Sequence, residues 1–188
     1  MQNNIWFKAL VLGILIFSNW LTIAQTGVYG IDSNQSKVSF KISHMGALKV
    51  NGIFSQYSGQ FIFRDEELLA VNCRVLVESV NTNSQERDDI IKNEAYFDID
   101  NYPYIKFQAD EFFVKDNNRN LKGLLRIKEG ENTLTFPYDL TYDKTLDQVK
   151  LMAETEIKRK DFNLVFGSMN GLIGNKVRIT LEIIATKQ

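Results

Sequence analysis

Residues 133–142 read TLTFPYDLTY, and apolar and polar side chains alternate along them without a break. Successive side chains of a β-strand point to opposite faces of the sheet, so a strict period of two is typical of a strand with one buried face. The stretch therefore predicts a half-buried strand and an all-β fold around it. Its apolar face would carry Leu134, Phe136, Tyr138, Leu140 and Tyr142.

The same alternation recurs along most of the chain. Residues 37–43, 71–77 and 121–128 carry it before this stretch, and residues 149–157 and 176–183 carry it afterwards. With the shorter runs between them, these segments predict roughly eight to ten strands joined by turns. One-sided patterning fits an antiparallel sheet that closes on itself with its apolar face inside. A sandwich of two packed sheets has the same periodicity, so both architectures stay open at this point.

Alternation stops between residues 81 and 94, where a short helix is predicted from about Gln85 to Lys92. The Thr-Asn-Ser run at residues 82–84 supplies candidate N-cap side chains. Arg87 is expected to pair with a carboxylate and to hold the helix across the base of the barrel. Asp88 is expected to favour the helix N-terminus electrostatically.

Aromatic residues crowd the segment after this helix. Residues 93–107 read NEAYFDIDNYPYIKF, and the proline fixes an extended turn before the next strand resumes. We expect the rings to close one end of the barrel beneath the helix, with the tyrosine hydroxyls reaching water or backbone groups. The predicted end-cap residues are Tyr96, Phe97, Tyr102 and Pro103, together with Arg87 and Asp88.

Composition argues against several classes of function. The chain has 22 Lys and Arg against 23 Asp and Glu, so it lacks the basic footprint of a nucleic-acid-binding protein. Cys73 is the only cysteine, which excludes an internal disulfide and a cysteine-based metal site, and we expect it to pack in the core. His44 is the only histidine and makes no metal site alone. No phosphate loop or catalytic signature is present, so no cofactor is expected.

The first 24 residues are typical of an export signal. Lys8 precedes an apolar run at residues 9–21, and the sequence TIA at 22–24 resembles a cleavage site. We expect cleavage after Ala24, which would leave residues 25–188 as one domain in the periplasm or outside the cell. The apolar run is short for a membrane span, so no stable span is expected after cleavage, while an uncleaved anchor stays open.

The apolar faces of the predicted strands would form one inner wall. If the barrel is hollow, that wall attracts a lipid tail, because burying each methylene is worth about 0.8 kcal/mol. If the barrel is filled, the same residues are an ordinary core, and the pattern alone does not decide between the two. The candidate lining residues are Phe40, Ile42, His44, Val50, Phe61, Phe63, Val75, Val77, Phe107, Leu125, Phe136, Tyr138 and Leu151.

Two polar features bear on a ligand head group. His44 is in phase with Phe40 and Ile42, so it would either contact a head group or be a buried histidine that a backbone group satisfies. The basic run at residues 158–160 makes Arg159 and Lys160 candidate head-group contacts. A solvated strand end explains that run equally well.

Three stretches, in their order and spacing, resemble the YceI-like family of secreted lipid-binding proteins. They are VSFKISHMGALKVNGIFSQYSG at 38–59, the segment 79–107 with its YFD and YPYIKF motifs, and IKRKDF at 157–162. The resemblance covers essentially the whole chain after the export signal. It implies an antiparallel, lipocalin-like closed barrel of about eight strands, with one short helix capping one end, around a cavity for a polyisoprenoid or similar lipid.

The wall and the resemblance together favour a non-enzymatic protein that binds, carries or sequesters a long apolar ligand outside the cytoplasm. Two alternatives stay open. One is an enzyme that uses His44 with an acid such as Asp98, and the other is a protein-interaction module on the outer face of a filled barrel. A quinone or fatty amide in place of the polyisoprenoid, and pairing of two barrels into a homodimer, also stay open.

Overall fold

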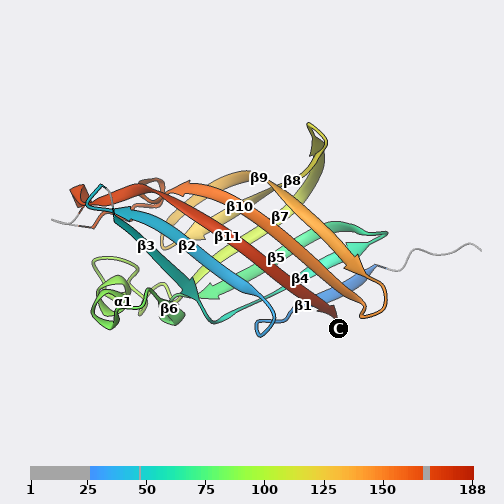
Figure 1. The fold of residues 1–188 in the computed structure, drawn as a ribbon, viewed down its shortest axis with the longest axis horizontal. Coiled ribbons are helices and arrows are strands. Elements are labelled where there is room, and N and C mark those ends of the chain that lie inside the picture. Colours follow the sequence, from blue (N-terminus) through green and yellow to red (C-terminus); the bar gives the residue numbers. More distant parts are fainter. Residues whose placement is uncertain (1–25, 47, 167–169) are drawn as a thin grey trace, which may run out of the picture.

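The computed structural model describes residues 26–46, 48–166 and 170–188, so the predicted export signal lies outside the described residues. Eleven strands form one antiparallel sheet in this part of the chain (Figure 1). The strands are β1 (Gly27–Ile31), β2 (Lys37–His44), β3 (Leu48–Phe54), β4 (Tyr57–Arg64), β5 (Glu67–Leu76), β6 (Val80–Asn81), β7 (Tyr104–Lys115), β8 (Asn118–Ile127), β9 (Gly130–Asp143), β10 (Gln148–Lys158) and β11 (Ile173–Lys187). The helices are η1 (Val77–Ser79), α1 (Gln85–Lys92) and η2 (Arg159–Phe162).

Strand β11 closes the sheet because its two ends have different neighbours. Its last residues pair with β1, from Ile31↔Ala185 to Tyr29↔Lys187. Its earlier part pairs with β2, including Val177↔Ile42. Eight strands thus form a ring in the order β1-β4-β5-β7-β8-β9-β10-β11, and β2, β3 and β6 extend the sheet from β11. The predicted closed antiparallel barrel is confirmed, and the sandwich is excluded.

Strand β9 contains the alternating stretch TLTFPYDLTY and shows why it folds as predicted. Phe136 and Tyr138 are buried, while the intervening Thr135, Pro137 and Asp139 are exposed. One face of the strand therefore contacts the barrel interior and the other contacts solvent.

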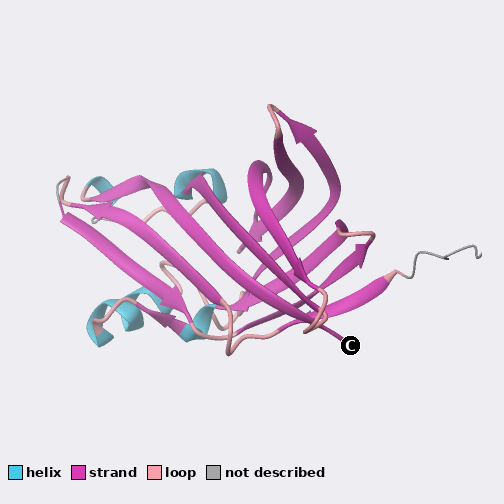
Figure 2. Ribbon diagram, turned by 45° about the vertical axis from the view of Figure 1, so that its right-hand side comes forward, coloured by secondary structure: helices cyan, strands magenta, loops and turns pink. Residues whose placement is uncertain are grey.

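Helix α1 spans the predicted residues and lies at one end of the barrel with the other helices (Figure 2). Ser84 is its N-cap and accepts a hydrogen bond from the backbone N–H of Arg87. The buried carboxylate of Asp88 accepts hydrogen bonds from the Thr82 hydroxyl at 2.6 Å and the Thr82 N–H at 3.0 Å. Arg87 donates to the Thr82 hydroxyl and carbonyl instead of pairing with a carboxylate, which corrects the expectation for that residue. Both side chains therefore tie the helix start to Thr82.

The opposite end of the barrel is closed by a cluster that we call the tyrosine end: Tyr29, Phe63, Tyr142 and Asp147. The Tyr29 and Tyr142 hydroxyls donate to Asp147 Oδ1 at 2.6 and 2.7 Å. The Phe63 ring lies 5.3 Å from the Tyr29 ring and 5.1 Å from the Tyr142 ring. Burial raises the pKa of Tyr29, and the two hydroxyls hold the pKa of Asp147 below its usual range. The cluster fills this end with side chains.

Gly123 of β8 lets the Phe107 ring approach the backbone closely. A Cβ at this position would stand 2.5 Å from Phe107 Cζ and 2.6 Å from the Gln108 carbonyl oxygen. A backbone atom cannot yield as a side chain can, so Gly123→Ala should lower the free energy of unfolding by about 2 kcal/mol, as overpacking does. Gly171→Ala is the control, because no atom lies within 4 Å of its added Cβ. Urea unfolding measures the stability of both variants, and equal stabilities would contradict the close contact of Gly123 with Phe107 and Gln108.

Candidate functional site

The barrel encloses a cavity of about 550 Å³. It extends from α1 into the middle of the barrel and stops short of the tyrosine end. Its volume falls in the range of small-molecule sites, about 300–1,000 Å³. The barrel is therefore hollow, which answers the question that periodicity left open. The predicted residues that line the cavity are Phe40, Ile42, His44, Val50, Phe61, Val75, Phe107, Leu125, Phe136 and Leu151.

Three predicted lining residues lie elsewhere. Phe63 follows a register shift in β4 and belongs to the tyrosine end. Tyr138 packs edge-on against Phe112 at 6.2 Å, away from the cavity. Val77 begins η1, where its N–H donates to the Pro103 carbonyl, so its buried side chain no longer follows the β5 alternation.

The predicted aromatic end-cap divides into two parts. Tyr96 and Phe97 line the cavity, and Tyr96 stacks on Phe166 at 4.7 Å. Tyr102 instead donates its hydroxyl to Glu129 at 2.7 Å, which raises the pKa of Tyr102. Pro103 is exposed. The expectation that all four residues close the barrel is therefore wrong for Tyr102 and Pro103, because Tyr102 packs on the β8–β9 turn beside Lys128 and Glu129 and Pro103 faces solvent.

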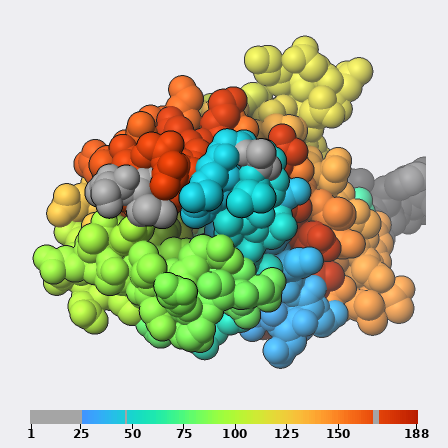
Figure 3. All heavy atoms as spheres, turned by 60° about the vertical axis from the view of Figure 1, so that its left-hand side comes forward, coloured from blue at the N-terminus to red at the C-terminus, as the bar shows by residue number. Residues whose placement is uncertain are grey.

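The lining is apolar along most of its length and polar near one end. Ser43 and His44 contribute from the end of β2, and Ser84, Glu86 and Arg87 contribute from the start of α1. These segments lie at the same end of the molecule (Figure 3), where the green α1 region meets the cyan β2–β3 hairpin. The cavity thus combines an apolar interior with hydrogen-bonding groups at the end that α1 covers. His44 lines the cavity beside these groups.

The sequence matches known proteins over almost all of the described residues. The family model described as the YceI-like domain matches residues 29–185. The chain belongs to the YceI-like family. A UPF0312 protein of Photorhabdus laumondii is 30% identical over 155 residues, which cover 81% of this chain and 72% of that relative.

Solved structures show the same YceI-like barrel. BcnA of Burkholderia cenocepacia superimposes with a TM-score of 0.75 at 24% identity, covering 83% of this chain and 99% of BcnA. A domain from Saccharophagus degradans superimposes with a TM-score of 0.71 at 13% identity, covering 87% and 100%. That domain is described as polyisoprenoid binding and implicated in plant cell wall breakdown. At these identities the likeness concerns the fold.

Arg159 of the YceI-like domain is a structural residue rather than a head-group contact. Its side chain is 1% exposed. The guanidinium donates to four backbone carbonyls, those of Leu164, Asn170, Ile173 and Gly174, at 2.5 to 3.0 Å. It also lies over the Phe166 ring at 4.5 Å. Lys160 is exposed and lies outside the cavity lining. The predicted head-group role is thus wrong for Arg159, whose guanidinium binds carbonyls of the loop after η2 and of the start of β11.

Sequence reasoning missed several lining residues. Ile90 and Ile91 reach the cavity from α1, and Val177 and Ile179 reach it from β11. The alternation of β11 contained the signal for the second pair, because those residues share a face with Leu181 and Ile183. No periodic signal identifies the first pair, since their position depends on how α1 packs on the barrel.

Cys73 packs against the buried core, as predicted, and it also lines the cavity. Its side chain is partly exposed, but to the interior of the barrel rather than to bulk solvent. Burial raises the pKa of the Cys73 thiol to about 12. Little thiolate forms at neutral pH, so the thiol is a weak nucleophile. It is well placed to report on what occupies the cavity.

None of the helices among the described residues is long and apolar enough to cross a membrane. Residues 26–46, 48–166 and 170–188 hold no group of three or more His, Cys, Asp or Glu side chains that could bind a metal ion. Asp98, the predicted alternative partner of His44, instead accepts hydrogen bonds from the Asn101 side chain and does not line the cavity. The structure therefore does not bring that pair together in the cavity.

Proposed function

We propose that this YceI-like protein binds a long apolar ligand in the barrel cavity and carries or sequesters it without catalysis. The observation that supports this function is the hollow interior, lined almost throughout by aliphatic and aromatic side chains. Each buried methylene contributes about 0.8 kcal/mol, so affinity grows with the length of chain that the cavity holds. That gain must offset an association cost of about 4–15 kcal/mol, which favours long chains over small solutes.

The distribution of polar groups supports one orientation of the ligand. A hydrocarbon tail would lie toward the tyrosine end, where the lining is apolar. A polar terminus would lie near Ser43, His44 and Arg87, where it could exchange hydrogen bonds. Leaving a polar group in the apolar half without a partner would cost about 1–3 kcal/mol.

A polyisoprenoid is the ligand class that we favour. The support is the Saccharophagus degradans domain of the same fold, which is described as polyisoprenoid binding. A quinone with an isoprenoid tail and a fatty amide are the competing classes. We further propose that the protein acts in the periplasm or outside the cell, an assignment supported by the export-signal pattern of residues 1–24.

Protection of Cys73 tests this function directly. The measurement is the rate at which methyl methanethiosulfonate, a small uncharged reagent, modifies the thiol, followed by intact-mass spectrometry. Saturation with geranylgeraniol should slow modification at least about tenfold, because the chain fills the space beside the thiol. Hexadecanamide and a short-tailed ubiquinone test the competing classes, and the probe that protects at the lowest concentration identifies the preferred one.

The control moves the only cysteine to the outer face of the same strand. In Cys73→Ser/Asn72→Cys the thiol is exposed to solvent, so no probe should protect it. If no probe protects Cys73, and organic extraction of the purified protein releases no apolar chain, the carrier function is wrong. Equal protection in both proteins would show a non-specific effect of the probes and would likewise count against binding in the cavity.

A further inference from the structure

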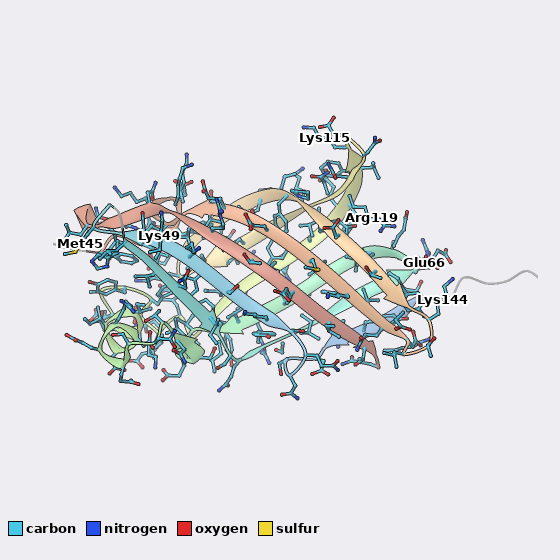
Figure 4. The ribbon with its side chains drawn as sticks, viewed as in Figure 1. Met45, Lys49, Glu66, Lys115, Arg119 and Lys144 are labelled. Atoms are coloured by element: carbon cyan, nitrogen blue, oxygen red, sulfur yellow. The ribbon has the colours of Figure 1, made fainter. Side chains whose placement is uncertain are left out.

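The tip of the β2–β3 hairpin carries two exposed large apolar side chains, whereas each of the other tight turns of the described barrel carries one or none. Met45 and Leu48 are 58% and 62% exposed at this tip. The β9–β10 turn exposes Leu146. The equivalent turns carry Asp65-Glu66, Asp116-Asn117 and Lys128-Glu129, as surface turns usually do. Figure 4 shows Met45 at the extreme end of the molecule, with Lys49 beside it and with Glu66 and Lys144 at the opposite end.

Other exposed apolar side chains gather at the same end of the barrel. The Met45 N–H donates to the Leu172 carbonyl at 2.6 Å, so the hairpin tip contacts the loop before β11. Leu172 and Val165 of that loop are exposed, and so is Ile90 of α1. We call this group the apolar rim: Met45, Leu48, Ile90, Val165 and Leu172.

The apolar rim is continuous with the cavity. Ile90 lines the cavity and is also exposed on the outside. Val165 lies between Leu164 and Phe166, which both line the cavity. Leu48 is the cross-strand partner of His44, another lining residue. A hydrocarbon could therefore pass from the outer surface to the interior along apolar side chains.

Lysines flank the hairpin side of this rim. Lys41 and Lys49 are exposed on the two strands that lead to the tip, and neither takes part in an ion pair among the described residues. A lysine near an anionic lipid surface contributes about 1 kcal/mol of attraction. The acids Glu86 and Asp89 lie on α1, so this attraction favours contact through the hairpin.

We propose that the apolar rim docks on a lipid bilayer with anionic head groups, with Met45 and Leu48 entering the interfacial region and the cavity opening toward the lipid. Exposed apolar surface of this kind marks an interaction site. The inference rests on the proposed function. If the ligand crossed water between the cavity and the membrane, exposing each of its methylenes would cost about 0.8 kcal/mol. Direct contact between the apolar rim and the bilayer avoids that cost.

Flotation with vesicles tests the docking surface. The protein is purified after export from the producing cells, and its N-terminus is determined by mass spectrometry. It should float with vesicles of equal phosphatidylglycerol and phosphatidylcholine, and more weakly with phosphatidylcholine alone. Met45→Ser/Leu48→Ser should reduce the partition coefficient by about tenfold or more, since two large apolar side chains no longer enter the lipid.

The control removes two apolar side chains of at least equal exposure from elsewhere on the barrel. Val114 and Leu146 are 73% and 64% exposed, so Val114→Ser/Leu146→Ser changes a comparable apolar surface outside the rim. This variant should float like the unaltered protein. Lys41→Gln/Lys49→Gln should lose the preference for phosphatidylglycerol while keeping the residual binding to phosphatidylcholine.

The outcomes separate this proposal from the carrier function. The rim variant should keep full protection of Cys73 by geranylgeraniol, because its cavity is unchanged. If geranylgeraniol fails to protect Cys73 in the unaltered protein while that protein still binds vesicles, the carrier function is wrong and the docking proposal stands. Flotation of the rim variant at the level of the unaltered protein would overturn docking. Docking would also be overturned if the unaltered protein does not float but self-associates, and the rim substitutions abolish that self-association. The apolar rim would then be the contact with a second copy of the chain.

Discussion

Replacing Val75 and Ile179 with tryptophan is expected to weaken the binding of geranylgeraniol roughly a hundredfold. Both side chains line the cavity, and they project from β5 and β11, which are not neighbours in the sheet. If the two indoles displace about four methylenes of the ligand, the loss is roughly 3 kcal/mol, and every 1.4 kcal/mol is tenfold in affinity. Because the rings enter empty space, the fold should tolerate them better than a packed core would.

Titration of Cys73 protection with geranylgeraniol measures this effect. The matched control is Ile62→Trp/Met152→Trp, in which two tryptophans are added to exposed, outward-facing positions of β4 and β10. That control should bind as the unaltered protein does. Thermal unfolding shows whether each double variant remains folded. A folded Val75→Trp/Ile179→Trp protein with unchanged affinity would show that the ligand lies outside the cavity.

Removing the guanidinium of Arg159 should cause the largest loss of stability, about 4 kcal/mol in the free energy of unfolding. The side chain satisfies the carbonyls of Leu164, Asn170, Ile173 and Gly174 from one buried position. Each buried acceptor left without a donor costs about 1–3 kcal/mol, and water entering the site would recover part of that sum. Arg159→Met keeps most of the apolar stem, so it isolates the contribution of the hydrogen bonds.

Urea unfolding compares this variant with two others. Arg159→Lys should also be destabilised by about 2 kcal/mol or more, because an ammonium cannot reproduce the planar fork of donors. Lys160→Met, at the exposed neighbouring position, should change stability by less than about 0.5 kcal/mol. If Arg159→Met were as stable as Lys160→Met, the anchoring role of the guanidinium would be refuted.

The architecture of this protein could be predicted from its sequence because period-two alternation reports directly which face of a strand is buried. The capped helix at Gln85–Lys92 was predicted correctly for an equally local reason, since a polar cap and a break in alternation are visible in a short window. Closure through β11 depends on pairing between residues more than a hundred positions apart, as in Ile31↔Ala185. No local pattern encodes it, and the resemblance to a known family supplied it instead.

The cavity lining could be predicted in part, and two of the wrongly predicted lining residues share one physical cause. Alternation identifies the inner face of a strand but not the height of a residue along the barrel axis. Phe63 and Tyr138 face inward as expected, yet they lie where the interior is filled by other side chains. Arg159 was misassigned because a basic run looks the same whether its central residue is solvated or buried. Only the folded structure shows which carbonyls its guanidinium binds.

The tyrosine end gives the barrel a consequence for ligand length. Tyr29 and Tyr142 are held by Asp147 across one end, so the interior is a blind tube rather than a tunnel. The depth of a cavity closed at one end limits the length of ligand that it can hold. Short ligands leave the closed end empty, and ligands beyond a certain length must protrude at α1. We therefore expect affinity to rise with each added isoprene unit and then to level off, at a length that residues near the tyrosine end determine.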